Sequence, residues 1–125
     1  DEIKALKLLR EKGYLLAVAS GSKLEDVKRA LQSTWINELF SVVMSAHQCD
    51  RPKPDPAIFH LTAKALGARP EQCLVIEDST IGITAAHQAG MKVFARKDSH
   101  FGNDLSLADN CFETYQQLQQ LLELN

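Results

Sequence analysis

Four short apolar segments alternate with helical patterns along this chain, and the alternation is the strongest constraint on its fold. The segments cover residues 14–19, 41–45, 73–77 and 91–95. They are apolar at nearly every position, which is typical of strands buried on both faces of a parallel sheet. The stretches between them carry apolar residues at helical spacing. The sequence therefore predicts an α/β fold, with a parallel sheet covered by helices on both faces.

Helix boundaries are signalled by residues with known capping preferences. Three helix starts are expected, at Ser22 with Glu25, at Asp55 with Pro56, and at Thr114 with Gln117. The first and last pairs have the spacing of a capping box, and an aspartate before a proline suits the N-cap and first helical position. Glycines at positions 13, 67 and 90 follow helical stretches, where a left-handed residue commonly ends a helix.

Composition limits the classes of function. The 125 residues are 45% apolar and 24% charged, and the net charge is −2. This length suits one domain with a hydrophobic core. Charges of both signs are interspersed, which argues against a nucleic-acid or membrane-binding surface, and no apolar stretch reaches the roughly 18 residues of a membrane span. We expect Trp35, with Leu39 and Phe40, to cover the core.

The cysteines and histidines form no recognisable site. Cys49, Cys73 and Cys111 have neither a CxxC pair nor a zinc spacing, so we interpret them as free thiols in a reducing, cytoplasmic compartment. The histidines share no spacing that is typical of a metal site. The tripeptide Asp98-Ser99-His100 has the residue types of a catalytic triad, but neighbours on one loop cannot adopt a triad's geometry.

One apolar run ends abruptly at two carboxylates. Ile76 is followed by Glu77 and Asp78, and Ser79 then suits the start of a helix. In open α/β sheets, ligands bind beyond the carboxyl ends of the strands. Two adjacent acids repel each other there unless a cation or a proton compensates, and a hard ion such as Mg²⁺ is a natural partner. Helix capping is the alternative, but it explains only one of these residues. The pair therefore predicts a metal site.

Two other segments carry groups suited to phosphate. Ser20-Gly21-Ser22-Lys23 offers two hydroxyls, a glycine that permits close backbone approach, and a helix N-terminus that favours an anion. Plain capping by Ser22 is the alternative. Lys53 has a proline on each side, which restricts its backbone and fixes the direction of its ammonium group. Such a cation can neutralise charge during phosphoryl transfer, whereas an exposed lysine in a stiff turn is the alternative.

The ordered trio of hydroxyl turn, proline-flanked lysine and acid pair resembles the haloacid dehalogenase-like hydrolase superfamily, and within it the β-phosphoglucomutase-like phosphatases. The matching segments are residues 17–23, 51–59 and 75–91. The resemblance implies a three-layer, Rossmann-like core. It also implies that Ser20 hydrogen-bonds the transferring phosphoryl group and that Lys53 steadies the nucleophile and the phosphoryl oxygens. By the same resemblance, the Mg²⁺ ligands are Glu77 and Asp78, and positions that contact phosphate in some relatives are Gly21, Ser22 and Lys23.

The sequence departs from this family in one respect. Members begin with an Asp-x-Asp motif on a central strand, whose first aspartate attacks phosphorus and whose second is a general acid and base, and no such motif occurs here. The cap domain, which selects the substrate, normally lies between that strand and the position of Asp1. We expect residues 1–125 to form the C-terminal portion of the core domain, without cap or nucleophile strand. Four other aspartates cannot substitute for this motif. Asp50 and Asp55 lie in the loop of Lys53, and Asp104 and Asp109 follow the last expected strand.

A sheet without its middle strand leaves buried backbone groups unpaired, at a cost of roughly 1–3 kcal/mol each. We expect a preceding segment of the same protein to fill the gap, and the alternatives are a domain-swapped partner or a rearranged sheet. We expect the chain by itself to be inactive.

The resemblance implies a Mg²⁺-dependent phosphomonoester hydrolase that acts on a small phosphorylated metabolite, such as a sugar phosphate. The reaction would proceed through an aspartyl-phosphate whose nucleophile lies outside this chain. Three alternatives stay open. They are a sugar phosphomutase, a non-catalytic fragment or pseudoenzyme that binds a phosphorylated ligand or a partner protein, and a phosphoacceptor signalling domain modified at Asp78.

Overall fold

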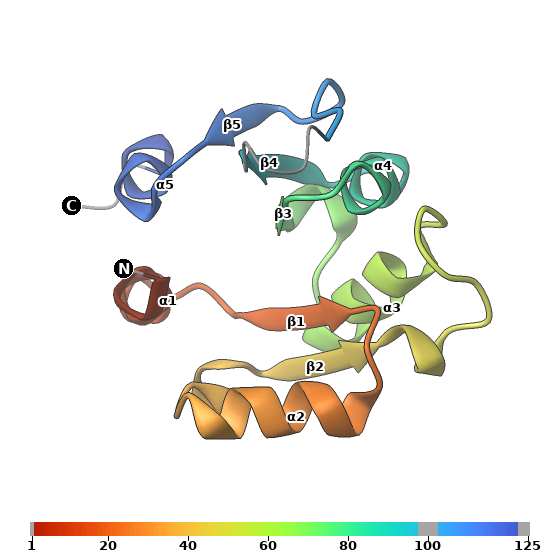
Figure 1. Ribbon diagram of the computed structural model, residues 1–125, viewed down its shortest axis with the longest axis horizontal. Coiled ribbons are helices and arrows are strands. Elements are labelled where there is room, and N and C mark those ends of the chain that lie inside the picture. The colour runs from red at the N-terminus through yellow and green to blue at the C-terminus, as the bar shows by residue number, and fades with distance from the viewer. Residues whose placement is uncertain (1, 98–102, 123–125) are drawn as a thin grey trace.

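Helices and strands alternate along the chain in the computed structural model, which describes residues 2–97 and 103–122 (Figure 1). The helices are α1 (Glu2–Glu11), α2 (Leu24–Ser33), α3 (Ala57–Leu66), α4 (Thr80–Gln88) and α5 (Tyr115–Leu121). The strands are β1 (Ala17–Ser20), β2 (Val42–Ser45), β3 (Leu74–Glu77), β4 (Lys92–Arg96) and β5 (Asn110–Phe112). All the strand pairs are parallel. The predicted α/β class is confirmed.

The strands form two separate sheets. One sheet pairs β1 with β2, and the other has the order β3-β4-β5. Figure 1 shows β1 and β3 as the facing edges of the two sheets, with no ladder between them. Among the described residues, this break is consistent with the missing central strand that the family resemblance implies.

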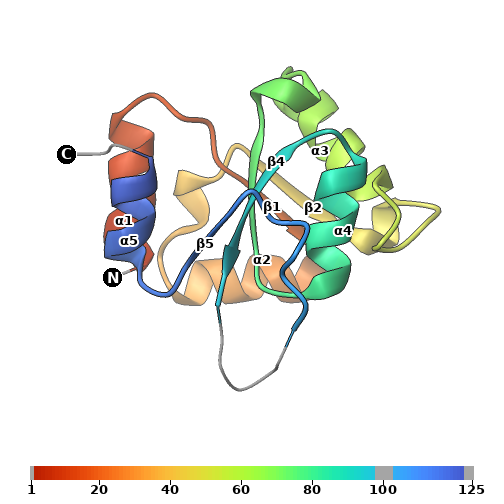
Figure 2. The same cartoon turned by 90° about the horizontal axis from the view of Figure 1, so that it is seen from above.

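Side-chain packing joins the two sheets. Helix α3 contacts β1 and β2, and it also packs against α4, which covers β3 and β4. Figure 2 shows α3 and α4 on one side of the strands and α1 beside α5 on the other. The core centres on Ile58, Ile83 and Val93, which are fully buried. None of the helices in the described part of the chain is long and apolar enough to cross a membrane.

The helix starts differ from expectation at two places. Helix α2 begins at Leu24 after Lys23, with no side-chain cap, so the predicted capping role of Ser22 is wrong. Helix α3 begins at Ala57, one residue later than expected, although Asp55 does accept a hydrogen bond from the Ala57 N–H at 2.9 Å. The capping box of Thr114 with Gln117 is confirmed, as are the left-handed glycines at positions 13, 67 and 90.

Strand β5 was not expected, so the prediction that Asp104 and Asp109 follow the last strand is wrong. Asp109 immediately precedes β5 and binds β4 through two hydrogen bonds of 2.8 Å. Its backbone N–H donates to the Val93 carbonyl, and its carboxylate accepts from the Val93 N–H. This aspartate therefore aligns β5 beside β4 and has a structural role.

Trp35 does not cover the core, contrary to expectation. Its side chain is 89% exposed, whereas Leu39 and Phe40 are half-buried. The φ angle of Trp35 is +61°. The Trp35 N–H donates to the Gln32 carbonyl, and the Ile36 N–H donates to the Leu31 carbonyl. Trp35 thus ends α2 in the position where glycine is usual. A left-handed residue with a Cβ costs about 1–2 kcal/mol there.

Candidate active site at the facing edges of the two sheets

The residues predicted to form a site lie at the carboxyl ends of β1 and β3. Ser20 is the last residue of β1, and Glu77 is the last residue of β3. Lys53, from the loop between β2 and α3, reaches both ends. Its Nζ lies 3.3 Å from the Ala19 carbonyl oxygen and 2.6 Å from Glu77 Oε2. One lysine therefore links the two sheets at the edge where ligands bind in α/β folds.

Lys53 is held on several sides and is not the exposed lysine of the alternative interpretation. Its side chain is 14% exposed, and that of Glu77 is 13% exposed. The ammonium nitrogen also lies 5.1 Å from the ring centroid of Phe59, which is buried on α3. Salt screens a pair this buried only weakly, and a cation over a ring face is attracted to it. The geometry therefore fixes a positive charge between the two strand ends.

The Asp78 side chain is exposed and does not cap helix α4. The N-cap of α4 is Ser79, whose hydroxyl accepts a hydrogen bond from the Gly82 N–H at 3.1 Å. Within residues 2–97 and 103–122, the Asp78 carboxylate has no hydrogen bond or ion pair. The Asp78 carbonyl accepts from the Asn103 side chain at 3.0 Å. Asp78 therefore presents a carboxylate to solvent from a backbone that is held in place.

A second segment reinforces this turn. The Thr80 hydroxyl donates to the Asp104 carbonyl at 3.1 Å and accepts from the Asp104 N–H at 3.0 Å. The Asp104 carboxylate in turn accepts hydrogen bonds from Ser106, which hold the pKa of this carboxyl below its usual value. Sequence reasoning missed Thr80 and Asn103, because bonds between a helix start and a distant loop leave no spacing signal.

The hydroxyl turn after β1 is ordered by its own backbone. The Ser20 hydroxyl accepts a hydrogen bond from the Ser22 N–H at 3.1 Å, and the Ser22 carbonyl accepts from the fully buried Ser45 hydroxyl at 2.6 Å. A Cβ added at Gly21 would meet no atom within 4 Å, so the turn is open there. The side chains of Ser22 and Lys23 are exposed. Sequence reasoning did not identify Ser45, which fixes the turn from β2.

The described residues fit part of a magnesium site. Mg²⁺ is usually bound by one or two carboxylates together with waters and substrate oxygens. Asp78 offers a carboxylate that has no hydrogen-bond or ion-pair partner within residues 2–97 and 103–122, and Glu77 has one oxygen, Oε1, that does not bond Lys53. In the described ranges no three His, Cys, Asp or Glu side chains are grouped as ligands. A complete site would thus need further ligands from outside these residues.

Among the described residues, no hydrogen bond or ion pair joins a cysteine or histidine to Lys53, Glu77 or Asp78. Burial raises the pKa of the Cys49 and Cys73 thiols, and the nearby carboxylates of Asp50 and Glu71 add to the effect, which favours the protonated thiol over the thiolate. The His60 ring lies 3.3 Å from the Ala89 carbonyl oxygen. The tripeptide of residues 98–100 lies outside the described residues.

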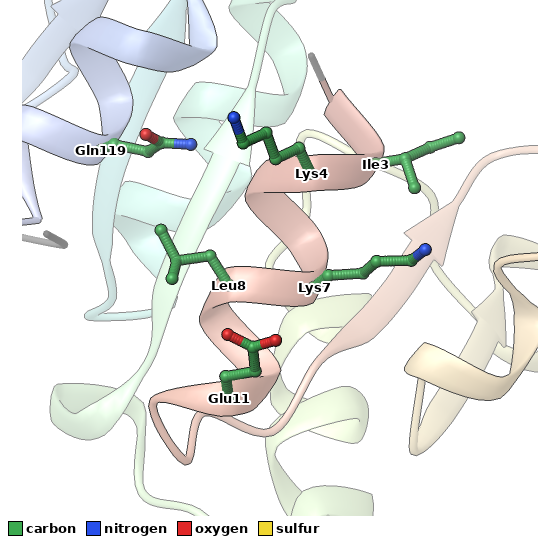
Figure 3. Close-up of a pocket in the computed structure, with 6 residues that line it drawn as sticks. All are labelled: Ile3, Lys4, Lys7, Leu8, Glu11 and Gln119. Carbon is green, nitrogen blue, oxygen red and sulfur yellow. The ribbon is translucent and has the colours of Figure 1, made fainter.

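A shallow pocket of about 420 Å³ lies between α1 and α5, away from the strand ends (Figure 3). Its lining residues are Ile3, Lys4, Lys7, Leu8, Glu11 and Gln119. In Figure 3 the side chains of Lys4 and Lys7 extend from α1 in different directions. The two cations therefore do not converge on a common ligand, and the pocket contains none of the residues predicted for the site.

Comparison with known proteins identifies related sequences. The family model described as haloacid dehalogenase-like hydrolase matches residues 1–96. A phosphoglycolate phosphatase of Pasteurella multocida is 38% identical over 88 residues, which are 70% of this chain and 39% of that protein. A bifunctional riboflavin kinase/FMN phosphatase of Arabidopsis thaliana is 38% identical over 104 residues, which are 76% of this chain and 27% of that protein.

Solved structures share the fold. The HAD phosphatase of Thermococcus onnurineus has a TM-score of 0.87 and 28% identity, and the match covers 100% of this chain and 58% of that one. The β-phosphoglucomutase of Clostridium difficile has a TM-score of 0.85 and 26% identity, and the match covers 96% of this chain and 52% of that one. The chain therefore spans little more than half the length of these structures, and less of the sequence relatives.

Proposed function

The chain belongs to the haloacid dehalogenase-like hydrolase family, and we propose that the protein containing it is a phosphatase of small phosphorylated metabolites. The observation that carries this proposal is the position of Lys53, whose ammonium group bridges the ends of β1 and β3. The hydroxyl turn and the acid pair stand on either side of it. The phosphatase names of the sequence relatives support the same reaction class.

In this proposal the substrate phosphate binds between the hydroxyl turn and the lysine. The Ser20 hydroxyl donates to a phosphoryl oxygen, and Gly21, Ser22 and Lys23 border the phosphate at the N-terminus of α2, where anions are favoured. Lys53 supplies a fixed positive charge beside the transferring group. Because the charge is already in place, little reorganisation is needed as negative charge develops.

The cofactor that we propose is Mg²⁺, held by Asp78 and Glu77. When bound, it would supply charge neutralisation and orientation of the phosphoryl oxygens. The Asp78 carboxylate, which has no hydrogen-bond or ion-pair partner within the described residues, supports this role. Glu77 Oε2 lies 2.6 Å from the Lys53 nitrogen, so the lysine is next to the acid pair.

The nucleophile, by our proposal, is an aspartate on a strand from outside residues 1–125, in a core domain of which this chain is the C-terminal portion. That strand would pair with both β1 and β3. Apolar side chains near the facing edges are exposed and would be covered by such a strand, since Ile76 of β3 is 41% exposed and Leu15, two residues before β1, is 56% exposed. Attack on phosphorus would break the phosphoester bond, release the substrate alcohol and form an aspartyl-phosphate, and water would then hydrolyse this intermediate to inorganic phosphate and the free aspartate. The chain by itself would bind phosphate weakly and turn over no substrate.

Hydrogen exchange tests the proposed strand. Amide protons of β1 and β3 that lack partners in the chain alone should exchange fast, and they should become protected in the longer protein or after addition of the strand as a peptide. Protection of β4 amides, which are already paired, should change little. Unchanged exchange at β1 and β3 would exclude pairing with a third strand.

Metal removal tests the reaction class in the longer protein. We expect hydrolysis of a phosphomonoester panel that includes sugar phosphates, loss of at least 90% of that activity with a chelator, and its return with Mg²⁺. Release of inorganic phosphate separates a phosphatase from a sugar phosphomutase, which instead yields an isomeric sugar phosphate. Phosphate binding without any turnover would contradict the proposal and favour a non-catalytic role.

The three cysteines are free, and each is only partly exposed. Unpaired thiols are usual for proteins kept in reducing compartments. They support a cytoplasmic location as part of this proposal.

A further inference from the structure

Gly82, in the first turn of α4, lies directly against the Glu77 carboxylate. A Cβ added at position 82 would lie 2.6 Å from Glu77 Oε2, and closer still to Cδ and Oε1. Real Cβ atoms essentially never make contacts this short. The Glu77 carboxylate thus occupies the space that a side chain at position 82 would require.

The backbone does not explain this glycine. Gly13, Gly67 and Gly90 have positive φ values, which favour glycine over residues with a Cβ. Gly82 is not among the residues with positive φ and lies within a regular helix. Glycine weakens a helix relative to alanine. The remaining reason for glycine is the space that it leaves for Glu77.

Neither partner can easily move away. Glu77 Oε2 is bonded to the Lys53 ammonium at 2.6 Å, and the side chains of the pair are 13% and 14% exposed. On the other side, the Gly82 N–H donates to the Ser79 hydroxyl, which fixes the first turn of α4. The carboxylate is therefore confined between a lysine and a helix backbone.

We propose that Gly82 is a positioning residue for Glu77. By having no side chain, Gly82 admits the carboxylate to the first turn of α4 and so maintains the ion pair with Lys53. The effect on metal binding rests on the proposed function, whereas the steric relation between positions 82 and 77 does not.

A double-mutant cycle in the thermal stability of the longer protein tests the steric relation without any ligand. Gly82→Ala should lower the melting temperature by several degrees when Glu77 is present. In a Glu77→Ala background the same change should raise the melting temperature or leave it unchanged, because alanine favours the helix. If Gly82→Ala does not fold alone but folds together with Glu77→Ala, the proposal is equally supported. An equal shift in both backgrounds would overturn it.

Thr84→Ala is the matched control for this cycle. Thr84 lies on the same helix, and its hydroxyl bonds the Thr80 carbonyl of that helix at 2.8 Å, not Glu77. Its effect should be the same in both backgrounds. A background-dependent shift for Thr84 would mean that Glu77→Ala perturbs α4 in general, and the assignment of Gly82 would then fail.

Calorimetric Mg²⁺ titration of the longer protein tests the consequence for the site. Gly82→Ala should weaken Mg²⁺ binding about tenfold. Adding Glu77→Asp should restore part of the lost affinity, because the aspartate side chain is one methylene shorter and leaves room for the alanine. Unchanged affinity in Gly82→Ala would overturn the positioning role. If the unsubstituted protein binds no Mg²⁺, the proposed function fails, and the stability cycle alone decides the assignment of Gly82.

Discussion

Lys53→Met is expected to lower the free energy of unfolding by about 3–5 kcal/mol, because it leaves the Glu77 carboxylate buried without its partner. The carboxylate is 13% exposed and lies 2.6 Å from the lysine nitrogen. The substitution also removes the bond to the Ala19 carbonyl that ties the lysine to β1. Urea unfolding followed by circular dichroism measures the change.

Two further variants separate charge pairing from general damage to the loop and α3. Lys53→Met combined with Glu77→Gln should regain much of the lost stability, since no uncompensated charge remains. Lys64→Met is the matched control, because it changes an exposed lysine on α3. It should change the free energy of unfolding by less than about 0.5 kcal/mol. If the double variant is as unstable as the single one, the ion pair is not the cause.

Asp78→Asn is expected to abolish most phosphatase activity of the longer protein, with a fall in kcat of roughly 100- to 1000-fold, the scale of losing one preorganised electrostatic group. The melting temperature without metal should stay within about 2 °C, because the carboxylate is exposed and makes no bond within the described residues. The Mg²⁺ concentration for half-maximal activity should rise.

Asp104→Asn is the matched control for this prediction. Asp104 lies beside the same turn, but its carboxylate accepts from the Ser106 N–H at 2.9 Å, which an asparagine oxygen can also do. Activity should therefore stay near that of the unsubstituted protein. Near-normal turnover in Asp78→Asn, or an equal loss in Asp104→Asn, would contradict the role of Asp78 in holding metal.

The helices and strands that the sequence predicted correctly are those marked by residues close together in the chain. Apolar runs located β1 to β4 to within a few residues, and the capping box of Thr114 with Gln117 located the start of α5. Strand β5 was missed because Asn110–Phe112 is short and only partly apolar, and its pairing depends on Asp109 reaching Val93. The exposure of Trp35 was missed because an aromatic side chain is usually buried, and no local pattern predicts a left-handed C′ residue without glycine.

The meeting of the motif-bearing segments was predicted in outline, whereas the roles of their residues stay predictions. The order of motifs indicated that Ser20, Lys53 and the acid pair meet at one edge, and the structure brings Lys53 to the ends of both strands. The pairing of Lys53 with Glu77, and the reason for Gly82, could not be read from the sequence. Both depend on distances between segments that are far apart in the chain.

Lys53 makes the loop of residues 51–55 part of the alignment of this site. Its ammonium group bonds the Ala19 carbonyl of β1 and the Glu77 carboxylate of β3. In the described residues no ladder joins β1 to β3, so this bridge and the packing of α3 against α4 hold the two strand ends together in the chain alone. In the longer protein, where the proposed third strand pairs with both, a change in the conformation of this loop would move the cation relative to the strand ends while the backbone pairing stays the same.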